Sequence, residues 1–190
     1  MKNYLENSTC KYRLAGIDLD GTLLDGKKNI SAANFAAVQQ LLSHGITVVL
    51  ATGRIYQQTI RYYRELGLKG PVVTSNGASV RVPFRSTLQE VNLQRAVSRD
   101  VLQIAKDFKI TALSYHREGI HITSFHDWND NMDLHRRDLG SFVKRGSVLR
   151  TGNRDLQKIL VFCPDPILLR DFEQAVAGQH GSSLTVDRNC

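Results

Sequence analysis

The stretch LAGIDLDGTLLD, residues 14–25, joins an apolar run to two aspartates that stand two residues apart. Asp18 and Asp20 lie where the apolar run ends, and Gly21 and Thr22 follow directly. Side chains at i and i+2 of an extended segment point to the same side, so both carboxylates are expected to face one place. A buried strand has no structural need for acids at its tip. The pattern therefore indicates that the two aspartates have a chemical role.

Strands and helices are expected to alternate through residues 12–81. Residues 31–45 and 54–67 are amphipathic and end at a glycine, which is typical of a helix, and Ser31 is the expected N-cap of the first. The apolar segments 46–53 and 71–77 are expected to form two more buried strands. Strands that are apolar on both faces and alternate with helices predict βαβ crossovers and a parallel, Rossmann-like α/β sheet.

Polar residues stand at the end of each of these three strands. They are Asp18 with Asp20, Thr52 with Gly53 and Arg54, and Asn76 with Gly77. Ligands of open α/β sheets bind at the carboxyl ends of the strands. The three groups are therefore expected to meet at one site.

The sequence pattern changes near Val82, and a second, α+β domain is expected over residues 82–190. Strands are expected at 86–93, 156–162 and 182–186, and helices at 98–108 and 165–178. Residues 110–124 are expected to form a hairpin that turns near Glu118 and Gly119.

Composition narrows the class of protein. The chain has 190 residues, 42% of them hydrophobic, and a net charge of +7, with the basic residues scattered rather than in a block. A phosphorylated small molecule accounts for this excess as well as nucleic acid does, and we expect no nucleic-acid partner. The apolar runs are far short of the ~20 residues of a membrane span, and the N-terminus lacks a secretory signal, so a cytoplasmic protein is expected. The three cysteines lack CxxC spacing, and free thiols are expected.

The residues at the strand ends suit phosphoryl transfer. Asp18 can attack a phosphate ester and form an aspartyl-phosphate, while Asp20 protonates the leaving oxygen. A Mg²⁺ ion held by a carboxylate and the phosphate would neutralise both anions. Thr52 offers a hydroxyl to a phosphoryl oxygen, and the amides of Gly53 and Arg54 are expected to open a helix whose N-terminus favours an anion.

Three motifs, DLDGTLLD (18–25), ATGR (51–54) and SNGA (75–78), resemble the haloacid dehalogenase superfamily, in particular the Cof-type phosphatases with a large α/β cap of the C2 type. The resemblance implies that Asp18 is the nucleophile and a magnesium ligand. It also implies that Asp20 is the acid/base, with a backbone carbonyl that helps to hold the magnesium, and that Thr52 is the threonine of the second motif. It extends more loosely over a cap at residues 82–186. The second acid favours phosphotransfer over carbon–halogen cleavage, because the dehalogenases lack it.

Several residues leave alternatives open. Arg54 fits phosphate binding and an ordinary helix start equally well, and Asn76 with Gly77 fits substrate binding and a turn. The segment HDWNDNMD (126–133) resembles the late metal motif of the family but has different spacing, and a polar cap loop is expected there. His116 and His121 are interpreted as ordinary histidines, and Lys158 as packing or surface charge.

The resemblance further implies a lysine and a GDxxND motif after the cap, and the sequence to residue 190 contains neither. We therefore expect the chain to cover the N-terminal part of a Mg²⁺-dependent phosphohydrolase of small phosphorylated metabolites, such as sugar phosphates. A phosphomutase, and a fragment or subunit without activity of its own, remain alternatives. In the family, later strands continue the sheet beyond the first strand. That strand is therefore expected at an open edge, where the chain could self-associate.

Overall fold

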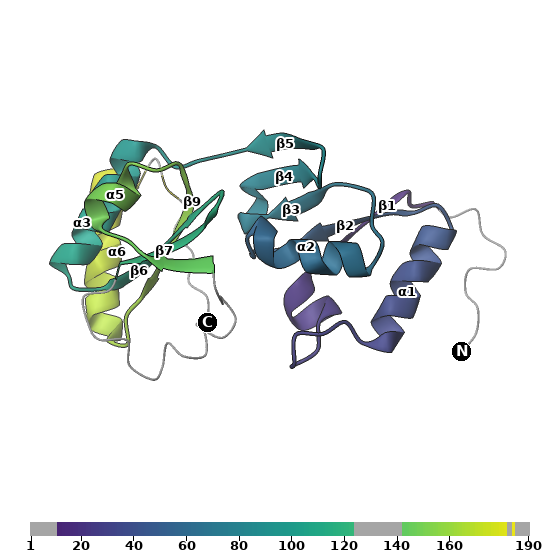
Figure 1. The fold of residues 1–190 in the computed structure, drawn as a ribbon. Helices are drawn as coiled ribbons and strands as arrows, with labels where there is room; N and C mark the ends of the chain where they lie inside the picture. The colour runs from purple at the N-terminus through teal and green to yellow at the C-terminus, as the bar shows by residue number, and fades with distance from the viewer. Residues whose placement is uncertain (1–10, 124–141, 182–183, 185–190) are drawn as a thin grey trace. The chain divides into compact units, whose positions relative to one another are not determined.

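The computed structural model describes residues 11–123, 142–181 and 184. The chain divides into two compact units, Met1–Glu90 and Val91–Cys190 (Figure 1). No helix in the described ranges has the length and apolarity needed to cross a membrane.

The first unit is a five-stranded sheet with the strand order β1-β2-β3-β4-β5 (Figure 1). The strands are β1 (Leu14–Ile17), β2 (Thr47–Ala51), β3 (Val72–Thr74), β4 (Ser79–Val82) and β5 (Ser86–Glu90). β1, β2 and β3 are parallel, and α1 (Ala32–Ser43) and α2 (Tyr56–Glu65) connect them. The predicted α/β alternation and the parallel sheet are therefore confirmed for the first three strands.

Both helices end as their glycines predict. Ser31 caps α1 by accepting a hydrogen bond from the backbone N–H of Asn34 at 3.2 Å. At the other end Gly45 has a φ of 74°, and its N–H donates to the carbonyl of Leu42 at 3.0 Å. Gly67 ends α2 in the same left-handed conformation, with a φ of 66°. Glycine adopts this conformation without the penalty that a Cβ brings, so these two positions direct the chain back toward the sheet.

The first unit has a hydrophobic core, and its sheet has an open edge at β1. The core includes Leu19, Val38, Leu50, Tyr62, Leu66 and Val72, all almost fully buried. In the described sheet β1 has a neighbour on one side only, and its Leu14 side chain is 59% exposed. The expected open edge at β1 is therefore confirmed.

The sequence suggested a boundary between the units near Val82. In the structure the division lies after Glu90. Ser86 pairs with Val82 and Glu90 with Ser79, so β4 and β5 form a hairpin at the edge of the first sheet. The turn closes with a hydrogen bond from the N–H of Arg85 to the carbonyl of Val82 at 3.1 Å. The residues around Pro83 thus form a hairpin turn. The change in sequence pattern near Val82 does not mark the end of the first unit.

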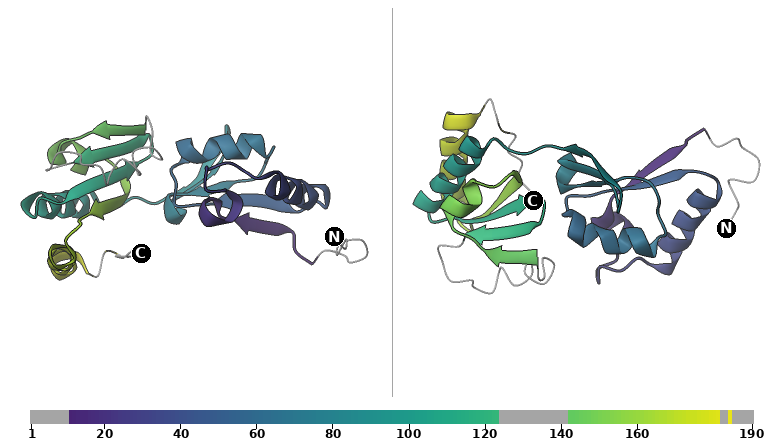
Figure 2. Two further views of the ribbon diagram at one scale, coloured as in Figure 1. Left: turned by 90° about the horizontal axis from the view of Figure 1, so that it is seen from below. Right: turned by 45° about the horizontal axis from the view of Figure 1, so that its top comes forward.

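The second unit has a four-stranded sheet with the order β8-β7-β6-β9. Its strands are β6 (Thr111–His116), β7 (Gly119–Thr123), β8 (Val143–Arg145) and β9 (Leu156–Phe162). Its helices are α3 (Arg95–Asp107), α5 (Val148–Gly152) and α6 (Pro166–His180), and Figure 2 shows them gathered on one face of the sheet.

The predicted hairpin, the strand at 156–162 and both predicted helices are confirmed. β8 and α5 were not predicted, because three and five residues are too short for a periodic pattern to show. The expected strand at 182–186 is not present at Leu184, which is irregular, and its other residues lie outside the described part of the chain. HDWNDNMD also lies outside it.

Two histidines meet inside the second unit. His116 ends β6 and is almost fully buried, and its ring stacks on that of His121 with the centroids 4.6 Å apart. Burial, followed by the charges of His121 and Arg154, lowers the pKa of His116 to about 4 from its ordinary value of 6.5. The pKa of His121 is lowered too, again mainly by burial. Both rings are therefore neutral at pH 7.

This pair predicts that the second unit loses stability in mild acid. Unfolded His116 takes up a proton near pH 6.5, whereas the folded form resists protonation until about pH 4. Stability should therefore fall as the pH drops from about 6.5 toward 4, and His116→Gln should show a weaker fall. Thermal unfolding at pH 7.5 and pH 5.0 measures the difference. An equal fall in both proteins would contradict the role of His116.

Candidate functional site

Two parallel strand ends place the paired aspartates beside the second motif. Ile17 of β1 pairs with Leu50 of β2, so Asp18 and Thr52 follow neighbouring strands at the same edge of the sheet. Asp18 is extended, and its Oδ1 accepts a hydrogen bond from the N–H of Leu19 at 2.7 Å. The expected placement of the acids at a strand tip is what the geometry shows.

The chain turns sharply after Asp18, through one irregular helical turn, Leu19–Leu23. Gly21 has a φ of 73°, and the turn closes with a hydrogen bond from the N–H of Leu24 to the carbonyl of Leu19 at 2.9 Å. The buried Leu19 and Leu23 anchor it in the core. Gly21 therefore lets the chain leave the strand while the carboxylate of Asp20, 40% exposed, stays at the surface.

Arg54 and Lys28 hold the carboxylate of Asp20. Arg54 donates from Nε to Oδ2 at 2.6 Å and from Nη2 to Oδ1 at 2.7 Å, a bidentate pair. Lys28 Nζ lies 2.8 Å from Oδ1. The hydrogen bond from Arg54, with a smaller contribution from Lys28, lowers the pKa of Asp20 to about 2 against an opposing effect of burial. Asp20 is therefore ionised at neutral pH.

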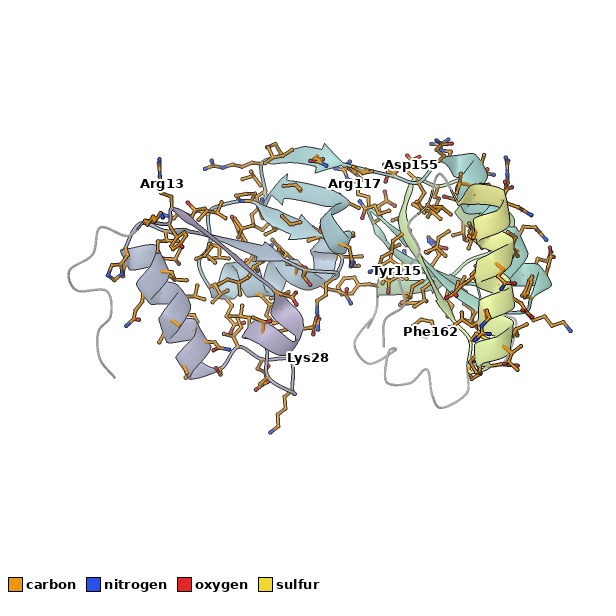
Figure 3. All side chains as sticks on the ribbon, turned by 180° about the vertical axis from the view of Figure 1, so that it is seen from behind. Arg13, Lys28, Tyr115, Arg117, Asp155 and Phe162 are labelled. Carbon is orange, nitrogen blue, oxygen red and sulfur yellow. The ribbon has the colours of Figure 1, made fainter. Side chains whose placement is uncertain are left out.

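Lys28 is the charged residue of the site that the sequence pattern did not single out. It lies on the loop that leads from the first turn to α1 (Figure 3). The Asp25 carboxylate closes this loop by accepting from the N–H groups of Lys27 and Asn29, at 2.8 and 2.9 Å. The Asp25-Gly26 pair, which directly follows Leu24, is a turn signal that could have placed the loop, though not the contact of Lys28 with Asp20.

The ATGR segment forms a tight turn after β2. Thr52 is almost fully buried, and its Oγ1 accepts from the N–H of Arg54 at 3.2 Å. The helix begins later than expected: α2 starts at Tyr56, and Ile55 is its N-cap. The prediction that the amides of Gly53 and Arg54 open the helix is therefore wrong, because the hydroxyl of Thr52 already turns the chain here.

The SNGA segment braces this turn from the neighbouring strand. The N–H of Ser75 donates to the carbonyl of Arg54 at 2.9 Å, and that of Asn76 donates to the carbonyl of Thr52 at 3.2 Å. A Cβ on Gly53 would lie 2.9 Å from Oδ1 of Asn76, so a larger residue here would require the Asn76 side chain to move. Ser75, Asn76 and Gly77 all have positive φ, and this turn is the structural role observed for Asn76 and Gly77.

The residues present suit a magnesium ion that keeps most of its water. The carboxylate of Asp18 and the backbone carbonyl of Asp20 are hard oxygen donors, which Mg²⁺ prefers. In residues 11–123, 142–181 and 184, no three His, Cys, Asp or Glu side chains gather closely enough to hold a metal ion.

Comparisons with known proteins identify the family of the chain. A family model described as haloacid dehalogenase-like hydrolase matches residues 16–189. Phosphatase YwpJ of Bacillus subtilis is 34% identical over 90 residues, 47% of this chain and 32% of that protein. An HMP-PP phosphatase of Yersinia enterocolitica is 39% identical over 149 residues, 76% of this chain and 53% of that protein. The match thus spans between a third and about half of these relatives' length.

A similar fold has been solved. The crystal structure of a haloacid dehalogenase-like hydrolase from Bacteroides thetaiotaomicron has a TM-score of 0.81 to this chain at 22% identity, over 94% of this chain and 68% of that one. At this level of identity the likeness speaks for the fold alone. The family model covers nearly the whole sequence, and with it the paired aspartates, so the chain belongs to the haloacid dehalogenase-like hydrolases, as a Cof-type member.

Proposed function

We propose that the protein is a Mg²⁺-dependent phosphohydrolase of small phosphorylated metabolites, such as sugar phosphates, that acts through an aspartyl-phosphate. The observation that carries the proposal is the pair Asp18 and Asp20 at the tip of β1, with Arg54 bound to Asp20 by two hydrogen bonds. The relative from Yersinia enterocolitica is named an HMP-PP phosphatase, which supports a phosphorylated metabolite as substrate.

In the first step a carboxylate oxygen of Asp18 attacks phosphorus, and the ester P–O bond breaks. The leaving oxygen takes its proton from Asp20, and Asp20 later accepts a proton from the water that hydrolyses the aspartyl-phosphate. Asp20 is ionised in the structure, and a phosphate dianion beside it would raise its pKa, because a like charge disfavours the charged form. Phosphate binding therefore favours the protonated form of Asp20 that the first step needs.

The residues of the second strand would orient the substrate. Arg54, with a guanidinium fork suited to oxyanions, would contact a phosphoryl oxygen as well as Asp20. Thr52 and Gly53 form the turn that carries Arg54, and Asn76 with Gly77 supports that turn. Thr52 would donate its hydroxyl proton to a phosphoryl oxygen, while Gly53, Asn76 and Gly77 would contribute by positioning Thr52 and Arg54.

Asp18 and the carbonyl of Asp20 would hold Mg²⁺. When bound, the ion would neutralise charge between the nucleophile and the phosphate. Because few protein donors face it, its binding should be weak and its removal easy.

Three wider proposals accompany this function. Residues 91–190, the cap of the family, would select the substrate, as the resemblance implies. The open edge of β1 supports self-association, because its unpaired backbone groups can accept another strand. The proposed metabolite substrates favour a cytoplasmic location of the protein.

Metal removal tests the function. The full-length protein should release inorganic phosphate from members of a panel of sugar phosphates and other small phosphate esters in the presence of Mg²⁺. Chelation with EDTA should lower the rate at least ~10²-fold, and added Mg²⁺ should restore it, because the nucleophile and substrate are both anionic. A colorimetric phosphate assay measures the rate. Activity that survives chelation would contradict the metal requirement, and isomerised product in place of free phosphate would identify a phosphomutase.

A further inference from the structure

Lys28 is a cation at the strand ends to which the mechanism above gives no role. Its Nζ lies 2.8 Å from Oδ1 of Asp20, the oxygen that also accepts from Nη2 of Arg54. The side chain is 37% exposed, so Lys28 is partly open to solvent. Two cations of this unit thus meet at one carboxylate.

The backbone at Lys28 is fixed in a conformation that costs energy. Its φ is 61°, in the left-handed region that side chains with a Cβ rarely adopt. The N–H of Lys28 donates to the carbonyl of Asp25 at 2.9 Å, and its own carbonyl accepts from Oη of Tyr62 at 2.9 Å. Tyr62 is 2% exposed and belongs to the core. The loop is therefore tied to α2, and this restricts where the ammonium group can lie.

A surface ion pair does not account for this arrangement. Exposed pairs contribute little to folding, so the contact with Asp20 alone is a weak reason to hold a lysine in a strained backbone. Charge offers a better reason. Before Mg²⁺ binds, Asp18 and Asp20 bring two negative charges to the place where a phosphate dianion must arrive, and Arg54 offsets one of them. A second cation lowers the repulsion that remains, and with Mg²⁺ bound it adds to the attraction for the dianion.

We propose that Lys28 binds the phosphoryl group of the substrate together with Arg54. The inference rests on the proposed function. An ammonium group has three N–H donors, so a bond to Asp20 is compatible with a second bond to a phosphoryl oxygen. Lys28 would then hold the phosphate beside Asp20, with the leaving oxygen close to the carboxyl group that protonates it.

The loop offers a matched pair of variants. Lys28→Ala removes the ammonium group and keeps the backbone cost unchanged, since alanine also has a Cβ. Lys27→Ala removes the same charge one residue away, from an exposed residue that contacts Asp25 through its backbone N–H. Lys28→Arg keeps a cation with several donors, and Lys28→Gln keeps polarity without charge and replaces the alanine variant if that one fails to fold.

In the full-length protein, Lys28→Ala and Lys28→Gln should raise KM for the best substrate of the panel roughly tenfold, with a smaller change in kcat. Lys28→Arg should stay within about threefold of the wild type, and Lys27→Ala should match it. Calorimetry with inorganic phosphate should show the same order of affinities. A role confined to folding would lower the unfolding temperature of the alanine variant without changing phosphate affinity.

Two failures can be told apart. If the wild type is an active phosphatase and Lys28→Ala equals Lys27→Ala in KM and in phosphate affinity, the role of Lys28 is overturned and the proposed function stands. If the wild type hydrolyses no phosphate ester and binds no inorganic phosphate, the proposed function falls, and the role of Lys28 falls with it.

Discussion

Asp18→Asn should lower the phosphatase activity of the full-length protein at least ~10³-fold, because an amide cannot form the aspartyl-phosphate. The side chain stands at the tip of β1, and its hydrogen bond from the N–H of Leu19 goes to an oxygen that asparagine retains. The fold should therefore survive the change. Steady-state phosphate release measures the loss, and circular dichroism checks the fold.

A second measurement bears directly on the nucleophile. Borohydride reduction of the enzyme during turnover should modify Asp18 in the wild type and leave the variant unmodified, because only an acyl phosphate is reduced. Glu65→Gln is a suitable control, since Glu65 is an exposed acid at the end of α2 in the same unit. Substantial activity in Asp18→Asn would refute the assignment of the nucleophile.

Asp20→Asn should impair turnover according to the leaving group. On alkyl phosphates, whose leaving oxygen needs a proton, the loss should be on the order of 10²–10⁴-fold. On nitrophenyl phosphate it should be much smaller, because nitrophenolate leaves without protonation. The comparison of kcat/KM for the two substrates isolates the acid role from any general damage to the site.

The contacts of Asp20 with Arg54 and Lys28 define what general damage to the site would look like in this test. Removing its charge also weakens its bonds to Arg54 and Lys28, which could affect the binding of every substrate alike. Such damage would lower both rates by the same factor. Equal loss on alkyl and nitrophenyl phosphates would therefore argue against Asp20 as the general acid.

Much of the fold could be predicted because local patterns report backbone conformation. Ser31 and Gly45 bound α1 as their capping chemistry requires, and the strand at Leu156–Phe162 ends where its apolar run ends. The hairpin of β6 and β7 turns next to Glu118 and Gly119, as expected. In each case the residues that carry the signal lie within a few positions of the feature that they determine.

The predictions that failed depend on contacts between distant segments. Pro83 gave a boundary signal, yet pairing of β5 with β4 keeps residues 83–90 in the first unit. His116 and His121 were interpreted as ordinary histidines, and the stacking of their rings was not anticipated. Two residues in a hairpin become neighbours through register, and register is decided by how the whole sheet packs.

The candidate site divides in the same way. The sequence by itself determined that Asp18 and Asp20 follow one strand and that Thr52, Gly53 and Arg54 follow the next, because apolar runs and glycines fix strands and turns locally. Only the tertiary structure decided that Arg54 and Lys28 both bind the carboxylate of Asp20. Arg54 is 34 residues from Asp20 along the chain, and Lys28 is 8 residues from it. Such contacts follow from the parallel register of β1 with β2 and from the loop tied to Tyr62, and both arise only when separate segments pack together.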